Sequence, residues 1–229
     1  MTVLIGLVLL MLLAFGPQLW ARYTFRRYAG PLSRVPGTGG QLARHLLDRF
    51  GMSGVKVEVT ETGADHYDPE TRTVRLGPGN HNGRSLTAVA VAAHEVGHAI
   101  QHDRNDPKLA LRHRLVGVAQ TAQQLGAASM FLVPVVAMLT HSPWGGLVMV
   151  LAGLASLGSA TLVHLVTLPV EIDASFGKAL PLLKAGRYIE PSDEPAVRRI
   201  LRAAALTYVA GSLASLLNLA RWVALLRRA

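Results

Sequence analysis

Three long runs without Asp, Glu, Lys or Arg constrain this chain more than any other feature of its sequence. A helix that crosses the hydrocarbon of a bilayer needs about 20 predominantly apolar residues. The longest run provides enough residues for two crossings, and a turn-forming cluster at His141–Gly146 divides it. The pattern therefore predicts three or four transmembrane helices. The charge-free runs are residues 1–21, 115–170 and 203–220.

Basic residues lie at the edges of these runs. Arg22, Arg26 and Arg27 follow the first run instead of preceding it, which favours an uncleaved anchor over a secretory signal peptide. By the positive-inside rule, the chain that follows the anchor is then cytoplasmic. The longest run is interpreted as a transmembrane hairpin of Val116–Thr140 and Leu147–Thr167, which returns the chain to the same side. The last run is short and Arg221 follows it, so it is either a fourth crossing or a buried or interfacial helix.

The overall composition is both basic and apolar. The net charge is +9, yet hydrophobic residues make up 50% of the chain and charged residues only 16%, against roughly 25% charged in a typical soluble domain. Soluble nucleic-acid binders are polar throughout, so we expect no nucleic-acid partner and assign the excess charge to a lipid bilayer. The absence of cysteine excludes disulfides, iron–sulfur clusters and a thiol nucleophile.

A small soluble part lies between the anchor and the hairpin. Helical spacing predicts a helix over Gln41–Phe50, and alternating or β-branched patterns predict strands over Val55–Val59 and Thr73–Leu76. Ser85 can cap a second helix that runs from Leu86 to about His102. The fold class expected is a mainly α membrane protein with a small α+β core.

The second helix carries the pattern that indicates chemistry, His94-Glu95-Val96-Gly97-His98. Histidines at positions i and i+4 stand on one helix face, so both imidazoles can bind one Zn²⁺. Glu95, next to the first histidine, is the candidate base for a water activated by the metal. The residues around the motif are uncharged, and two histidines and a glutamate in an apolar helix require partners.

A catalytic zinc ion needs a third protein ligand. His102 is on the same helix face but two turns from His94, too far to complete a tetrahedron. Glu171 follows the predicted hairpin, which returns the chain to the side it left, and we choose it as the third ligand. Pro169 can start a helix with this glutamate in its first turn. The later glutamates, Glu190 and Glu194, lie in a polar loop and are expected to be solvated.

Asp173 is a candidate partner for the far nitrogen of a ligand histidine. A surface carboxylate is an equally good interpretation. In many zinc proteases with a glutamate ligand, the supporting aspartate stands four residues after it, and here that place is Ser175.

With these motifs the sequence resembles the YugP-type bacterial membrane neutral zinc metallopeptidases, over nearly the whole chain. It is more distantly similar to membrane zinc proteases in which a transmembrane hairpin separates H-E-x-x-H from a glutamate ligand. The resemblance implies one catalytic Zn²⁺, with His94, His98 and Glu171 as ligands and Glu95 as the catalytic residue. Ile172 stands where the family would have Phe. The matching stretches are Asp65–Pro69, Asn82–Ser85, Ala92–Gln101, Val166–Ser175 and Ala203–Ala210.

The function expected is that of a membrane-embedded endopeptidase acting on peptides or membrane proteins. Strand Thr73–Leu76 is a candidate for aligning an extended substrate by main-chain pairing, or is simply structural. His66, Tyr67 and Tyr208 are candidate oxyanion donors. Two alternatives stay open: a protease with its motif inside the lipid, and a zinc-binding membrane module without catalysis. The sequence predicts no oligomeric state.

The expected location is the bacterial cytoplasmic membrane, with several crossings and the catalytic part on the cytoplasmic side. The chain then divides into a transmembrane anchor (1–21), a zincin-like cytoplasmic part (22–115), a transmembrane hairpin (116–168), a third-ligand helix and loop (169–202), and a final transmembrane or interfacial helix (203–229).

Overall fold

The structure, a computed structural model, describes residues 2–61, 64–140, 163 and 166–206. The chain forms two compact units. One comprises Met1–Gly16, Ala110–Thr167 and Tyr208–Ala229, and the other comprises Pro17–Leu109 and Leu168–Thr207. In the first unit the described elements are the start of α1 (Thr2–Arg27) and most of α5 (Pro107–Thr140).

The prediction of three or four transmembrane helices is wrong for the described residues. Among them, no helix combines the length and the apolar character that a membrane crossing requires. The prediction counted charge-free length, but a crossing requires about 20 predominantly apolar residues within one helix. The multi-pass location in a cytoplasmic membrane rested on those crossings and is not supported either. The second arm of the predicted hairpin and most of the last segment lie outside the described residues.

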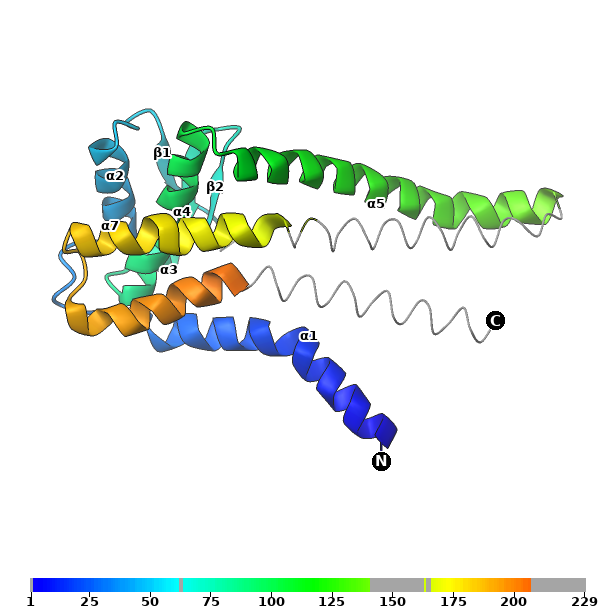
Figure 1. Cartoon of the computed structure of the whole chain (residues 1–229), viewed down its shortest axis with the longest axis horizontal. Helices are drawn as coiled ribbons and strands as arrows, with labels where there is room; N and C mark the ends of the chain where they lie inside the picture. The colour runs from blue at the N-terminus through cyan, green and yellow to red at the C-terminus, as the bar shows by residue number, and fades with distance from the viewer. Residues whose placement is uncertain (1, 62–63, 141–162, 164–165, 207–229) are drawn as a thin grey trace. The chain divides into compact units, whose positions relative to one another are not determined.

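The second unit contains a short sheet that packs against helices, among them α2 and α4 (Figure 1). Its last helix covers residues 194–206. Before that helix, the unit contains the end of α1 from Pro17 and the first residues of α5. Its other elements in chain order are α2 (Gly39–Arg49), β1 (Lys56–Val59), β2 (His66–Asp68), β3 (Thr73–Leu76), α3 (Pro78–His81), α4 (Leu86–Asp103), a helical segment at 166–172 that enters the unit at Leu168, the π-helix η1 (Asp173–Ala179), α7 (Leu180–Ala185) and the 3₁₀ turn η2 (Pro191–Asp193).

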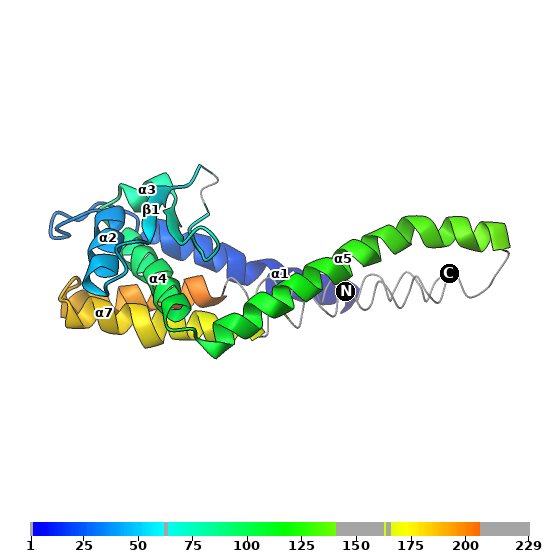
Figure 2. The ribbon, with the colours of Figure 1, turned by 90° about the horizontal axis from the view of Figure 1, so that it is seen from above.

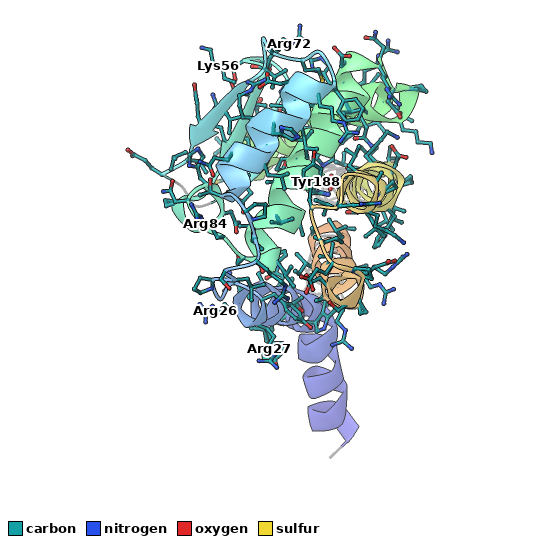
Figure 3. All side chains as sticks on the ribbon, turned by 90° about the vertical axis from the view of Figure 1, so that its left-hand side faces the viewer. Arg26, Arg27, Lys56, Arg72, Arg84 and Tyr188 are labelled. Carbon is teal, nitrogen blue, oxygen red and sulfur yellow. The ribbon has the colours of Figure 1, made fainter. Side chains whose placement is uncertain are left out.

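Side-chain caps define where the two predicted helices begin. Ser85 accepts a hydrogen bond from the Ala88 backbone N–H and starts α4, as predicted. Thr38 and Gln41 form a reciprocal capping box, so α2 starts two residues earlier than expected. Farther along the chain, Tyr188 (labelled in Figure 3) packs against this helix. Its hydroxyl lies 2.7 Å from Nε2 of His45.

The sheet has three strands in the order β1-β3-β2. β1 pairs with β3 in parallel, and β2 pairs with β3 antiparallel. β3 therefore has a bonded neighbour on each side, which contradicts the prediction that Thr73–Leu76 aligns a substrate. β2, which the sequence patterns did not predict, is an edge strand of this sheet.

The helix α4 is the centre of the second unit. It contacts α2, α3, β2, β3, η1 and α7, and Figures 1 and 2 show α2 and α7 beside it. Its residues from Leu86 to Gln101 are all buried. Gly97 permits the close approach of η1: a Cβ at this position would lie 2.8 Å from the backbone oxygen of Ala174. The tight contact brings the segment that follows Glu171 directly against the helix that carries the motif.

Glu171 lies within a continuous helical segment and not in the first turn of a helix. Residues 166–172 are helical, and the π-helix begins at Asp173. Pro169 therefore does not start this helix, contrary to the prediction. π-helical turns occur frequently at functional sites, and this one begins two residues after the predicted ligand.

Candidate metal centre

Two buried imidazoles stand one above the other on α4. His94 and His98 are 5% and 6% exposed, and their ring centroids are 4.7 Å apart. The helical segment at 166–172 brings Glu171, which is fully buried, to the same point. Its Oε2 lies 3.2 Å from Nε2 of His94 and 3.3 Å from Nε2 of His98. One donor atom from each of the three side chains lies within 4.8 Å of the others.

The two imidazoles determine the charge state of Glu171. Burial by itself would raise the pKa of this carboxyl group, but nearby His98 and His94 outweigh burial and hold the pKa well below its usual range. Glu171 is therefore a carboxylate at neutral pH. An anionic oxygen facing two imidazole nitrogens is a donor set that suits Zn²⁺.

Glu95 occupies the same buried region but has the opposite electrostatic character. Burial raises its pKa from 4.5 to about 7; His94 and a backbone hydrogen bond from Tyr67 oppose this increase, whereas Glu171 and Asp65 contribute to it. A carboxyl group that titrates near neutral pH can both accept and return a proton.

The far nitrogens of the two imidazoles have separate partners. Nδ1 of His94 lies 3.0 Å from Oγ of Ser175, in η1. Nδ1 of His98 lies 2.9 Å from Oε1 of Gln101, one turn along α4. These contacts occupy the Nδ1 positions and leave both Nε2 atoms directed at Glu171.

Asp173, the predicted partner of an imidazole, lies one step farther away. Its Oδ2 accepts a hydrogen bond from Nε2 of Gln101 at 2.8 Å, and Lys178 forms an ion pair with it at 2.9 Å. Hydrogen bonds from Gln101 and Lys178 outweigh the effect of burial and lower its pKa. The amide of Gln101 thus bridges Asp173 and His98 by hydrogen bonds.

The candidate oxyanion donors are already engaged where they are described. The hydroxyl of Tyr67 lies 2.8 Å from Nδ1 of His102, and burial raises the pKa of this tyrosine. His66 is exposed, and its Nδ1 lies 2.9 Å from the backbone oxygen of Ala64. Tyr208 lies outside the described residues.

Zinc fits this constellation. Three donors of the types that zinc prefers converge within one ion's reach. The hydrogen bonds at Nδ1 are the kind of outer contact that orients histidine ligands in metal sites. The buried and anionic state of Glu171 supplies the negative charge that a divalent cation requires.

A buried helix carrying H-E-x-x-H beside a short sheet, with a glutamate brought in from a distant segment, defines a metallopeptidase-like site. The chain belongs to the family described as "Putative neutral zinc metallopeptidase", which matches residues 3–227. It is 37% identical over 221 residues to the "Putative membrane protease YugP" of Bacillus subtilis (strain 168), with 94% of each chain covered. No solved structure matches the chain. The family resemblance predicted from the sequence is confirmed.

The sequence patterns assigned no role to two residues of this site, Gln101 and Ser175, although Ser175 is identified from the sequence as standing where a supporting aspartate is common. Gln101 follows His98 by three residues, a spacing that places it on the same helix face, and it is 1% exposed. Ser175 follows Glu171 by four residues and is fully buried. Helical spacing from the ligands could have indicated both.

Proposed function

We propose that the chain is a zinc-dependent endopeptidase in which His94, His98 and Glu171 hold the metal and Glu95 is the general base. One observation carries this proposal: Oε2 of Glu171 lies within 3.3 Å of both Nε2 atoms, beside a buried glutamate on the same helix as the histidines. Membership of the zinc metallopeptidase family supports the reaction class and peptide substrates.

Glu95 carries the proton through the reaction. A bound zinc ion would polarise the substrate carbonyl and make the attacking water more acidic. The carboxylate of Glu95 takes the proton of that water as it attacks, and later delivers it to the leaving amine. In the metal-free protein, burial raises the pKa of Glu95 to about 7, which brings its titration close to neutral pH. The hydrogen bond from the Tyr67 backbone holds this carboxylate in place.

The edge strand β2 is positioned to align the substrate. It pairs with β3 on one side, contacts α4, and includes Tyr67, whose backbone bonds to Glu95. An extended peptide can add to such an edge by main-chain hydrogen bonds. We propose this role for β2 in place of β3.

The decisive test compares two isosteric substitutions. Glu95→Gln should retain bound zinc and lose cleavage of casein, because only the proton acceptor is removed. Glu70→Gln, at an exposed position after β2, is the matched control and should cleave as the parent does. Full activity in Glu95→Gln would refute the mechanism.

Chelation and zinc addition in the parent protein distinguish an enzyme from a zinc-binding module without activity. A structural zinc site does not require a carboxyl group next to its histidine ligands. The enzyme is supported if the parent binds zinc and cleaves casein, with cleavage lost on adding a chelator and restored by zinc. A parent that binds zinc stoichiometrically and cleaves neither casein nor a peptide library would instead indicate the module.

A further inference from the structure

We propose that Ser175 and Gln101 are positioning residues that fix the tautomer and ring orientation of the two histidines, Ser175 for His94 and Gln101 for His98. Each histidine then presents an unprotonated Nε2 to the metal. This inference rests on the proposed function and assigns roles to two residues that do not themselves contact the metal.

The hydroxyl of Ser175 contacts both His94 and the backbone oxygen of Leu201. A serine hydroxyl has one hydrogen, and we assign it to the bond with the Leu201 oxygen at 3.3 Å, which can only accept. With this assignment, Nδ1 of His94 carries the hydrogen of the 3.0 Å contact with Oγ. In a neutral imidazole, a protonated Nδ1 leaves Nε2 with a free lone pair. Because Ser175 is fully buried, water does not compete for this bond.

The amide of Gln101 reaches the same result by a different arrangement. Its Nε2 donates to the backbone oxygen of Val170 at 3.0 Å and to Asp173 at 2.8 Å, which uses both hydrogens. Rotating the amide by half a turn would place its oxygen against two other oxygens, so the orientation is determined by the network. Oε1 therefore faces Nδ1 of His98 at 2.9 Å and accepts its hydrogen.

Asp173 and Lys178 complete the arrangement around Gln101. The wider turn of η1 brings these residues, five apart in sequence, into an ion pair at 2.9 Å. The pair keeps the carboxylate directed at the Gln101 amide. In many metal sites, a ligand histidine donates its other ring N–H to a carboxylate, which makes the histidine more basic. Here the contacts at Nδ1 are a neutral hydroxyl and a neutral amide.

Zinc affinity in a matched set of variants tests this proposal. Ser175→Ala and Gln101→Met should each weaken zinc binding about 10–100-fold, the usual effect of losing such an outer partner. Thr167→Val is the control, because Thr167 is 1% exposed, lies four residues before Glu171, and within the described part of the chain its hydroxyl bonds to the backbone oxygen of Val163. The control should bind zinc as the parent does, and Ser175→Thr should recover most of the lost affinity.

A spectroscopic measurement on the parent chain makes the proposal independent of how the variants fold. In the zinc-loaded protein with ¹⁵N-labelled histidine, the two imidazoles that shift on adding zinc should both show a protonated Nδ1. A protonated Nε2 in either ring, or unchanged zinc affinity in Ser175→Ala and Gln101→Met, would overturn the inference. A parent chain that binds no zinc would instead refute the proposed function.

Discussion

Replacing Gly97 by alanine should loosen the metal centre without removing any ligand. The added Cβ would lie 2.8 Å from the backbone oxygen of Ala174, whereas ordinary contacts begin at 3.4 Å. The backbone of α4 and η1 must therefore separate by about half an ångström, and overpacking of this kind costs about 1–3 kcal/mol. Metal–ligand distances tolerate only about ±0.2 Å. Because η1 follows Glu171 directly, we expect weaker zinc binding as well as lower stability.

The assay pairs thermal unfolding of the metal-free protein with zinc titration against a chromophoric chelator. In a chain of this size, each kcal/mol lowers the melting temperature by about 2–4 °C. Gly117→Ala is the matched control: for this exposed helical glycine, no described atom outside its own helix backbone and chain neighbours lies within 4 Å of the added Cβ, so the substitution should be neutral or slightly stabilising. If Gly97→Ala retains the parent's melting temperature and zinc affinity, the close packing of α4 against η1 does not determine the site.

Three further substitutions have defined outcomes. Glu171→Ala should reduce zinc affinity by more than the about 10–100-fold expected for an outer partner, as measured by chelator competition; unchanged affinity would exclude Glu171 as a ligand. In the metal-free protein, burial raises the pKa of Glu95 from 4.5 to about 7. The folded state therefore holds this proton more tightly than the unfolded state, and the resulting stability is present at pH 4.5 and lost as the pH rises through 7. Glu95→Gln should therefore unfold at a higher temperature than the parent at pH 8, with little difference at pH 5; a parent with no such pH dependence would contradict the buried, titrating carboxyl. Arg34→Ala removes the 2.6 Å hydrogen bond that the Arg34 guanidinium donates to Oδ1 of the buried Asp193, and should lower the melting temperature while zinc affinity stays constant. A loss of zinc binding would show that this ion pair affects the site.

Local patterns in the sequence were sufficient to predict α4 and its chemistry. The cap at Ser85, the apolar flanks and the spacing of His94 and His98 are all short-range features, and the structure reproduces the helix to within one residue of the expected end. Glu171 could be chosen because glutamates are scarce after the motif. The structure brings its carboxylate to the two imidazoles.

The remaining features depend on contacts between distant segments. β2 has only three residues and forms by pairing with β3, so its own sequence has no strand pattern to detect. The central place of β3 in the sheet depends on that pairing. The length of charge-free sequence overestimated membrane crossing, because it does not measure the apolar character of one continuous helix. The role of Ser175 depends on the contact of η1 with α4, which joins residues far apart in the chain.

X-ray absorption at the zinc edge of the stoichiometrically loaded protein tests the central claim most directly. If His94, His98 and Glu171 hold the metal, one zinc ion per chain should show two imidazole nitrogens at about 2.0–2.1 Å together with oxygen donors at about 2.0–2.2 Å. The imidazole scattering should disappear when both histidines are replaced by alanine. A zinc environment without imidazole, or one that the double replacement leaves unchanged, would contradict the account.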